Sequence, residues 1–410
     1  MSWLALVISF STLTGYNFLF WIIIGLGRFL FEKFPNSPKR KRGRPVRPIT
    51  PEEVAAVIPA HNEQRTIRRA ARALLRILPK RNIYVASDYS TDRTVPLARA
   101  MGVRVLDIKP NRGKARALVY AMKHYRLLSR YRAILINDAD VEINRNYLKR
   151  ALPVFKDKKI VAVAPHGVTR WRKYKFWESF FIAYRIRLWR IVQVGMRFGQ
   201  TWRFTNVTFI VPGSLSLYRT KVLKKLHIAA PGLIIEDFNM TFELHKKKLG
   251  RITYNPAIFG IHQDPYNLRD YVKQVRRWDL GFWQTVKRNG VWPSLFWLST
   301  GSFILELTLY AIFLLLVPIL LVLFTLNSFE PLNIPLVASN LSLLDLAIGL
   351  FAMDYFTTII AAVFEKKPIL LLYGLGFIFL RYIDAFIHLY TLPMAFIVKS
   401  RGIWISPKRK

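Results

Sequence analysis

Two carboxylates stand two positions apart at the end of an apolar run, in the sequence Ile-Leu-Ile-Asn-Asp138-Ala-Asp140. If the run is a β-strand, both side chains point the same way, because side-chain direction repeats at every second residue of an extended chain. Two such carboxylates repel each other unless a cation lies between them and a ligand. Mg²⁺ or Mn²⁺ bound with a nucleotide diphosphate meets that need. The pattern predicts a metal and nucleotide site at Asp138 and Asp140, although a capping turn could also use two acids.

A second acidic pair, Glu236-Asp237, precedes a helical pattern that runs from Asn239 to Lys248. Adjacent carboxylates need not both ionise fully, so one of them can serve as a base. An acceptor hydroxyl that has to act as a nucleophile needs such a base, and Asp237 is the candidate. The other interpretation is that the two acids stabilise the first turn of a helix.

Three more polar motifs follow predicted strands. In VIPAHNE, Asn62 and Glu63 stand where they could hold the base edge of a ligand, and Asp88 in SDYSTDRT can accept the imide proton of a uracil ring. In NRGKARAL, Gly113 and Lys114 open a helix, whose N-terminal N–H groups favour an anion such as a diphosphate. Each motif alone also fits a helix cap, a turn or a solvated basic loop.

Two further motifs lie later in the chain. Ser214, in Pro-Gly-Ser, can form a tight wall close to a sugar or an acceptor, unless it belongs to a plain β-turn. In the sequence Gln-Val-Arg-Arg-Trp, Gln274 shares a helix face with Arg277 and Trp278. Arg277 could bind a departing diphosphate and Trp278 could stack on a sugar ring, whereas both residues also suit a membrane-surface helix.

The elements that must position these motifs are short apolar runs that alternate with amphipathic stretches between residues 51 and 265. This rhythm predicts an α/β fold with a mostly parallel sheet and helices on both faces. In open sheets of this kind ligands bind beyond the carboxyl ends of the strands, where the motifs stand. The predicted strands are 54–60, 83–87, 103–108, 133–138 and 161–165.

The composition restricts the possible partners and ligands. Lys and Arg number 63 against 24 Asp and Glu, for a net charge of +39. Such an excess suits nucleic acid, anionic lipid or phosphorylated substrates, and the positive-inside tendency of membrane proteins accounts for only part of it. Cysteine is absent, which excludes disulfides and thiolate-bound zinc or iron–sulfur sites. Any metal must therefore take oxygen or imidazole ligands.

Apolar segments predict a membrane part at both ends of the chain. Residues 3–27 carry no charge and are long enough to span a bilayer core of ~30 Å. The basic run at 39–47 places that side in the cytoplasm and the N-terminus outside. Further apolar segments lie at 307–326, 341–364 and 369–398, and the basic tail favours a hairpin of two short helices in the last one over a single span.

Two stretches predict amphipathic helices at the membrane surface. Residues 266–290 and residues 171–198 are both rich in Arg, Lys, Trp and Tyr, which suit the boundary between lipid and water. The other interpretation is a half-buried helix of the soluble domain. The stretch between the fourth strand and Gly213, unusually rich in Arg and Trp, matches no motif.

Taken together and in this order, the motifs resemble the inverting glycosyltransferase family 2, and within it the membrane-bound processive synthases of cellulose, chitin, hyaluronan and poly-N-acetylglucosamine. The resemblance covers about residues 50–290 and the flanking apolar segments. It implies a GT-A type nucleotide-sugar-binding domain with a mixed, mostly parallel sheet flanked by helices, plus α-helical transmembrane segments. It also implies metal-dependent, inverting transfer from a UDP-sugar to a growing glycan at the cytoplasmic membrane face.

The resemblance implies a role for each motif residue. Asp138 and Asp140 would bind Mg²⁺ or Mn²⁺, and Asp237 would be the general base. The donor and acceptor would be bound by the remaining residues, which are Glu63, Asp88, Lys114, Asp138, Ser214, Glu236, Gln274, Arg277 and Trp278. The membrane part is smaller than that of the larger synthases, so export through this chain alone is not implied.

The expected organisation has five parts. They are an N-terminal transmembrane helix (1–30), a cytoplasmic catalytic domain (50–265), an amphipathic interface helix with the Gln-x-x-Arg-Trp motif (266–295), a C-terminal transmembrane region (296–398) and a basic cytoplasmic tail (399–410). The expected partners are a UDP-sugar, a glycan or lipid-linked acceptor and the lipid bilayer.

Three alternative functions stay open. A polyprenyl-phosphate or glycolipid monosaccharide transferase needs the nucleotide and metal motifs but not Gln-x-x-Arg-Trp. The net charge suits nucleic acid, yet no nucleic-acid motif is present and the acids cluster at strand ends, so no nucleic-acid partner is expected. A transporter would use Asp354, Arg381 and Asp384 within the apolar segments, but it would leave the large α/β domain without a role.

Overall fold

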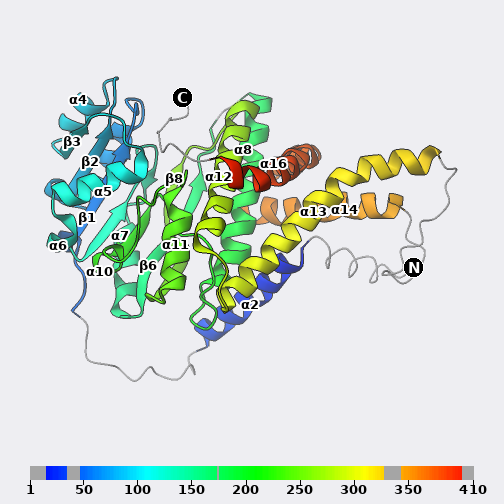
Figure 1. Cartoon of the computed structure of the whole chain (residues 1–410), viewed down its shortest axis with the longest axis horizontal. Coiled ribbons are helices and arrows are strands. Elements are labelled where there is room, and N and C mark those ends of the chain that lie inside the picture. The colour runs from blue at the N-terminus through cyan, green and yellow to red at the C-terminus, as the bar shows by residue number, and fades with distance from the viewer. Residues whose placement is uncertain (1–14, 35–46, 173–174, 327–342, 399–410) are drawn as a thin grey trace.

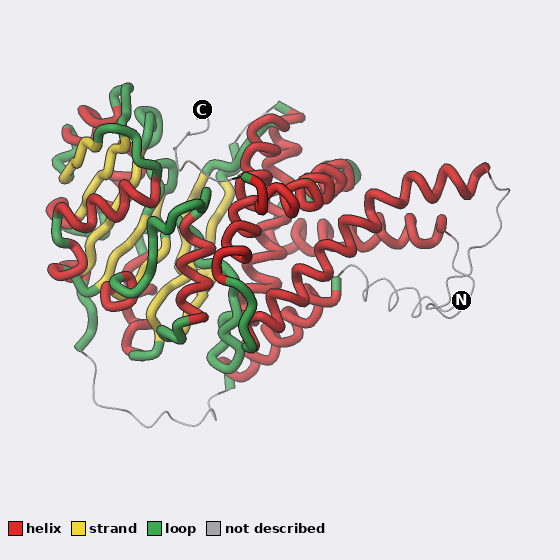
Figure 2. Tube along the Cα trace, in the orientation of Figure 1, coloured by secondary structure: helices red, strands yellow, loops and turns green. Residues whose placement is uncertain are grey.

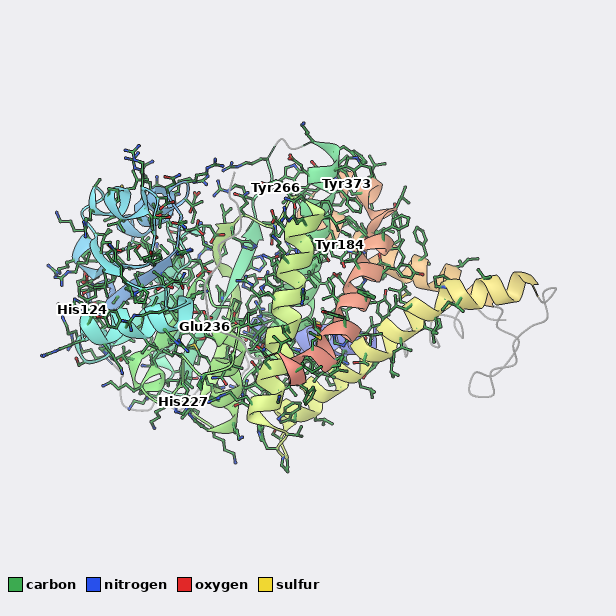
Figure 3. The ribbon with its side chains drawn as sticks, turned by 45° about the horizontal axis from the view of Figure 1, so that its top comes forward. His124, Tyr184, His227, Glu236, Tyr266 and Tyr373 are labelled. Atoms are coloured by element: carbon green, nitrogen blue, oxygen red, sulfur yellow. The ribbon has the colours of Figure 1, made fainter. Side chains whose placement is uncertain are left out.

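The computed structural model describes residues 15–34, 47–172, 175–326 and 343–398. The strands gather in one half of the molecule, and the long helices gather in the other half (Figures 1 and 2). Figure 3 shows the same division, with His124 in the α/β domain and Tyr184 and Tyr373 among the long helices. We call this second half the helical part; it consists of α2, α8, η4, α9 and α12–α16.

In the described residues the sheet has eight strands, in the order β3-β2-β1-β4-β7-β6-β8-β5. β1 pairs in parallel with β2 and β4, and β2 pairs in parallel with β3, whereas β7 runs antiparallel to both β4 and β6. The strands are β1 (Val54–Ala60), β2 (Ile83–Asp88), β3 (Arg104–Ile108), β4 (Ala133–Ile136), β5 (Glu142–Ile143), β6 (Ile160–Thr169), β7 (Ser216–Arg219) and β8 (Arg251–His262). The predicted mixed sheet flanked by helices is confirmed.

Every residue of β1 is buried, because helices cover both faces of the sheet. One hydrophobic core includes Ile67 of α3 and Leu148 of α7, and the other includes Leu118 of α5 and Met240 of α11. The helices of this domain are α3 (Ile67–Leu75), α4 (Thr94–Arg99), α5 (Lys114–His124), α6 (Leu127–Arg130), α7 (Tyr147–Ala151), α10 (Thr220–Leu223) and α11 (Glu236–Lys246).

The helical part packs against the edge of the α/β domain through α8 and α12. α8 contacts β6 on one side and α14 and α15 on the other, and α12 packs along both α11 and α16. Its elements are α2 (Tyr16–Lys33), α8 (Phe176–Trp189), the π-helix η4 (Arg190–Arg197), α9 (Phe198–Gln200), α12 (Leu268–Asn289), α13 (Leu295–Leu326), α14 (Leu343–Glu365), α15 (Ile369–Gly374) and α16 (Phe377–Ile397).

Sequence chemistry explains the bounds of α12. It begins after Asn267, whose side chain accepts a hydrogen bond from the backbone N–H of Asp270, as an N-cap residue does. It ends at Gly290, which has φ 68°, a conformation that favours glycine. The amphipathic helix predicted at 266–290 therefore forms, but one face packs on the α/β domain and the other on α16.

The apolar segments differ in detail from their predicted form. The sequence predicts a hairpin of two short helices within 369–398. The structure has the six-residue α15 and the 21-residue α16 there, so only the first helix is short. By length and composition, the stretch Leu295–Ile319 is the one candidate membrane span among the described residues. Residues 1–14, the loop 327–340 and the tail 399–410, on which the expected orientation depends, lie outside the described residues.

A buried ion-pair group joins three elements of the helical part. The Asp354 carboxylate of α14 lies 2.6 Å from Arg187 Nη1 of α8 and 3.1 Å from Arg381 Nε of α16. The Arg187 side chain is 2% exposed and that of Asp354 is 4% exposed. The charges of Asp354 and Arg381 within the apolar segments therefore face the ion-pair group with α8.

We expect Asp354→Leu to lower the free energy of unfolding by about 3–5 kcal/mol, since it leaves the buried Arg187 guanidinium and the partly exposed Arg381 guanidinium without their carboxylate. Thermal unfolding in detergent solution, followed by circular dichroism, measures the effect. Asp107→Asn, on the surface of β3, is the control. An unchanged melting temperature in Asp354→Leu would show that this group does not hold the helices together.

Candidate active site

A cavity of about 1000 Å³ extends from the carboxyl end of β4 into the helical part. Asp138 and Asp140 line it at the sheet end, and Tyr310 and Asp384 line it between α13 and α16. All of the predicted site residues except Asn62 and Asp88 line this cavity, namely Glu63, Lys114, Asp138, Asp140, Ser214, Glu236, Asp237, Gln274, Arg277 and Trp278. The sheet thus delivers these motifs to one place, as expected for the carboxyl ends of strands.

Lys114 connects the acidic motifs. Its Nζ lies 2.9 Å from Asp138 Oδ1 and 3.2 Å from Glu236 Oε1. Burial disfavours the charge of the lysine, but the two carboxylates outweigh it and raise the pKa of Lys114. Lys114 is the first residue of α5 and follows Gly113, which has φ 85°. The cation therefore stands at a helix N-terminus, beside backbone N–H groups that favour an anion.

Asp138 and Asp140 lie beyond the end of β4, in the irregular segment and the turn that follow the strand. Burial raises the pKa of Asp138, Lys114 opposes the rise, and the charge of Asp140 adds to it. The Asp138 backbone N–H donates to Ser214 Oγ at 3.1 Å. Two carboxylates in this state are stabilised by a further cation.

The donor chemistry of this pair suits Mg²⁺ or Mn²⁺, which take oxygen ligands. In the described ranges no three His, Asp or Glu side chains are grouped closely enough to hold an ion by themselves. Phosphate oxygens and water would have to complete the coordination, as is usual for Mg²⁺ bound with a nucleotide. Asp138 and Asp140 therefore fit a metal that arrives with its diphosphate.

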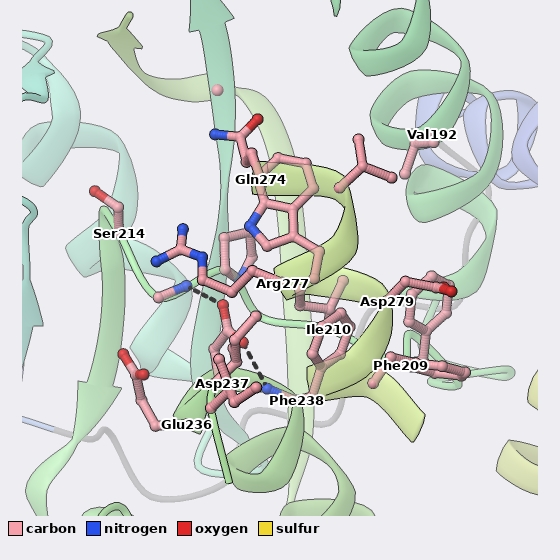
Figure 4. A pocket seen from close by; sticks show the side chains of 18 of the residues that line it. Val192, Phe209, Ile210, Ser214, Glu236, Asp237, Phe238, Gln274, Arg277 and Asp279 are labelled. Atoms are coloured by element: carbon pink, nitrogen blue, oxygen red, sulfur yellow. Dashed lines mark hydrogen bonds between the residues drawn. The ribbon is translucent and has the colours of Figure 1, made fainter. Parts of the chain in front are cut away.

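Asp237 has the properties of a general base. Burial and the neighbouring charge of Glu236 raise the pKa of Asp237 to about 7, although three groups oppose the rise. One is Lys114, and the other two are the backbone N–H groups of Gly213 and Phe238, each 2.8 Å from an Asp237 carboxylate oxygen (Figure 4). A carboxyl that titrates near neutral pH is suited to accept a proton in the cell.

Gly213 allows the acids and the lysine to approach one another. A Cβ at this position would lie 3.1 Å from Lys114 Nζ and 3.2 Å from Asp237 Oδ2. Any larger residue would therefore press on both charged groups. The glycine of the Pro-Gly-Ser motif leaves room for this close approach.

The Gln-x-x-Arg-Trp residues of α12 line the same cavity as Asp237. In the view of Figure 4, Gln274 and Arg277 lie above the Asp237 carboxylate. The Trp278 ring packs beside Trp189 of α8, with 5.6 Å between centroids. One turn further along, a Cβ on Gly281 would lie 2.9 Å from Ile235 Cγ1, so α12 lies directly against the segment that leads into α11.

Asp88 and Asn62 are the predicted residues that lie elsewhere, and Asn62 Oδ1 accepts a hydrogen bond from the Thr91 backbone N–H. Asp88 is the better enclosed of the two. It is fully buried, and its carboxylate accepts hydrogen bonds from the backbone N–H groups of Arg112 (2.8 Å) and Gly113 (2.7 Å). In this position it holds the loop that carries Lys114. Its predicted contact with a nucleotide base stays a prediction. Glu63, also buried, lines the cavity and accepts from Thr66 Oγ1 at 2.7 Å.

Sequence reasoning missed His262 and Asp264, which line the cavity at the end of β8. His262 Nε2 lies 3.0 Å from Asp264 Oδ2. Burial disfavours both charges, yet the pair raises the pKa of His262 and lowers that of Asp264 to about 2. Asp140 also raises the pKa of His262, so the acidic turn after β4 favours the protonated form of this ring. The signal available was His-Gln-Asp after an apolar stretch, but 251–262 was not among the predicted strands.

The cavity is richer in acids than the rest of the chain. Nine Asp and Glu line it, against seven Arg and Lys, although the whole chain has a net charge of +39. A cavity of this kind is suited to a ligand that brings its own cation.

Comparisons with known proteins agree with this chemistry. Residues 51–281 match the family model described as glycosyltransferase like family 2. Hyaluronan synthases of Streptococcus pyogenes are 25% identical over 296 residues, which is 66% of this chain and 64% of theirs. The probable glycosyltransferase YdaM of Bacillus subtilis is 27% identical over 242 residues, 56% of this chain and 55% of that protein. The chain thus spans less than two thirds of the length of these relatives.

A solved structure shares the fold. The mannosyltransferase PcManGT from Pyrobaculum calidifontis, in complex with GDP-Man and Mn²⁺, has a TM-score of 0.52 at 16% identity, covering 92% of this chain and 98% of that one. The α/β domain is therefore of the GT-A type. Because the family model spans more than half of the sequence, this chain belongs to the glycosyltransferase like family 2.

Proposed function

We propose that this glycosyltransferase uses a UDP-sugar and Mg²⁺ or Mn²⁺ to extend a glycan at the cytoplasmic face of a membrane. The observation that carries the proposal is the continuity of one cavity. Its sheet end has the Asp138–Asp140 pair and Lys114, its middle has Asp237 and the α12 motif, and its far end lies between α13 and α16. Donor, acceptor and membrane would then meet along one path.

The reaction follows from the positions of these groups. Asp237 accepts the proton of the acceptor hydroxyl, and the hydroxyl oxygen attacks the anomeric carbon from the side opposite the diphosphate. The bond between that carbon and the diphosphate oxygen breaks, so the configuration inverts. Lys114 and Arg277 stabilise the negative charge on the departing diphosphate. A divalent cation held by Asp138 and Asp140 would supply further positive charge to the phosphates.

The membrane location rests on the helical part. α13 contains the candidate span, and large apolar side chains of α13 and α16 such as Leu298, Ile319 and Phe379 are exposed. Exposed apolar surface of this kind suits lipid. We keep the five-part organisation expected from the sequence, with the catalytic domain and the basic tail in the cytoplasm and the N-terminus outside.

The alternative acceptor is a lipid phosphate, as in a polyprenyl-phosphate or glycolipid monosaccharide transferase. Arg381 favours it, because this guanidinium lines the cavity among the membrane helices. Glu306 and Asp384 line the same end and oppose it, since acids repel a phosphate. Because the two acids outnumber the one arginine at this end of the cavity, a hydroxyl-rich glycan is favoured over a lipid phosphate as the acceptor.

Metal dependence is the first test. Purified protein incubated with a panel of UDP-sugars and Mn²⁺ should release UDP, and both a chelator and Asp140→Asn should abolish the release. Asp237→Asn should lower kcat by about 10²- to 10⁴-fold, the usual contribution of a general base. Asp107→Asn is the control and should behave as wild type. Full activity with the chelator and in both site variants would refute the proposal.

The pH dependence tests the role of Asp237. The base must be deprotonated, so kcat/KM should be high above pH 7 and fall as pH decreases through an apparent pKa of about 7. Glu236 is one cause of the raised pKa, so Glu236→Gln should shift this limb to lower pH. UDP release measured from about pH 5 to about pH 9 gives the profile. A limb that stays in place in Glu236→Gln would argue for another base.

Trp278→Ala separates the two acceptors. A glycan synthase should lose elongation and make short products, because the indole ring no longer supports a sugar ring. A lipid-phosphate transferase should keep most of its activity. Product size, measured by gel or mass spectrometry beside UDP release, decides between them.

A further inference from the structure

The Arg- and Trp-rich stretch that matched no motif contains a buried cation at the active site. Arg185 of α8 is 1% exposed and lines the cavity. Its Nη2 donates to Gln274 Oε1 at 2.7 Å. The guanidinium also lies over two rings of α12, 4.7 Å from the centroid of Tyr271 and 4.9 Å from that of Trp278. One side chain of α8 thus contacts two members of the Gln-x-x-Arg-Trp motif.

Within the described part of the chain no carboxylate lies within 4.0 Å of the Arg185 guanidinium, and its buried Nε has no hydrogen-bond partner. The charges of Asp264 and Asp384 act on Arg185 only from a greater distance. Arg187, two residues later, pairs with Asp354 instead. A buried unpaired cation is unfavourable, and two aromatic faces and an amide oxygen offset part of that cost. A planar guanidinium can make these contacts together, whereas an ammonium cannot.

The Tyr271 ring that contacts Arg185 is itself held in place by residues of α8 and α16. The Tyr271 hydroxyl donates to Asp384 of α16, and the Tyr184 hydroxyl of α8 donates to the same carboxylate at 2.6 Å. The rings of Tyr184 and Tyr271 also contact each other, with centroids 5.9 Å apart. Three helices therefore determine where the guanidinium lies.

The contact with Gln274 determines which way its amide faces. A guanidinium only donates hydrogen bonds, so it must bind the amide oxygen. The amide N–H₂ of Gln274 is then left to donate. An acceptor sugar presents hydroxyl and ring oxygens that can accept from it.

We propose that Arg185 is a positioning residue, which orients Gln274 as a hydrogen-bond donor and fixes the plane of the Trp278 ring for the acceptor. This inference rests on the proposed function, in which Trp278 of the α12 motif supports the acceptor sugar. It assigns to α8 the alignment of the acceptor and leaves the binding of the donor nucleotide to the sheet end and Arg277.

The test compares Arg185→Gln and Arg185→Lys with Arg276→Gln, a neighbouring exposed arginine of α12 as control. Both Arg185 variants should reduce elongation on the order of 10²-fold, the effect of a misplaced reactant, with the Kd for UDP unchanged. Wild-type elongation in Arg185→Lys would overturn the proposal, because charge alone would then suffice. A large increase in the UDP Kd would also overturn it, because Arg185 would then bind the donor.

A second experiment uses the same contact without touching Arg185. Gln274→Glu gives the unpaired cation a carboxylate, so it should raise the melting temperature and yet abolish elongation, since a carboxylate cannot donate. Gln274→Leu should lower the melting temperature. An unchanged melting temperature in Gln274→Glu would contradict the arrangement, even if Arg185→Gln fails to fold.

A double-mutant comparison completes the design. If Arg185 acts through Gln274, the Arg185→Gln and Gln274→Ala pair should lose little more elongation than either single variant. Additive losses would mean that the two residues act separately. Wild-type protein that releases no UDP from any sugar nucleotide refutes the proposed function itself, whereas active wild type with normal Arg185 variants refutes the positioning role alone.

Discussion

The active site depends on one cation held among buried carboxylates. Lys114 Nζ bridges Asp138, at the end of β4, and Glu236, at the start of α11, so a single side chain connects two motifs about 100 residues apart. Asp88 fixes the loop that presents the lysine, and Gly213 leaves the space in which the charges meet. Because Lys114 is engaged mainly by Asp138 and Glu236, Asp237 keeps the raised pKa that a base near neutral pH requires.

The helical part forms part of the cavity that contains this site. Its helices line the end of the cavity far from the sheet. α12 packs directly against Ile235, which immediately precedes Glu236 and Asp237. The ion-pair group at Asp354 holds α8 against α14 and α16, and α8 in turn contacts Gln274. The end of the cavity between the helices therefore depends on how these helices assemble, whereas the end at Asp138 and Lys114 is built by the α/β domain.

Strands β1 to β4 and β6 and the grouping of motifs were predictable because period-two and apolar patterns are local, and carboxyl ends of parallel strands share an edge. The short strands β5 and β7 were not predicted. The burial of Asp88 was not predictable from the sequence, because it depends on how the loop 111–113 folds back over β2. β8 was missed since Asn255-Pro256 interrupts its apolar pattern, and its neighbour β6 is distant in sequence. Arg185 could not be found because α8 is buried on most sides and shows no single apolar face.

The acid-lined cavity in a strongly basic protein affects how a substrate arrives. Positive charge over the surface draws anions from solution and raises the rate of encounter, and this attraction weakens as ionic strength rises. The interior lacks this positive excess, since nine acids and seven Arg and Lys side chains line the cavity. A nucleotide that enters it exchanges a basic surface for a lining in which carboxylates stand beside the cations. Under the proposed function, a divalent cation bound to the diphosphate would then favour entry of the complexed nucleotide over the free one, before any bond to the sugar is broken.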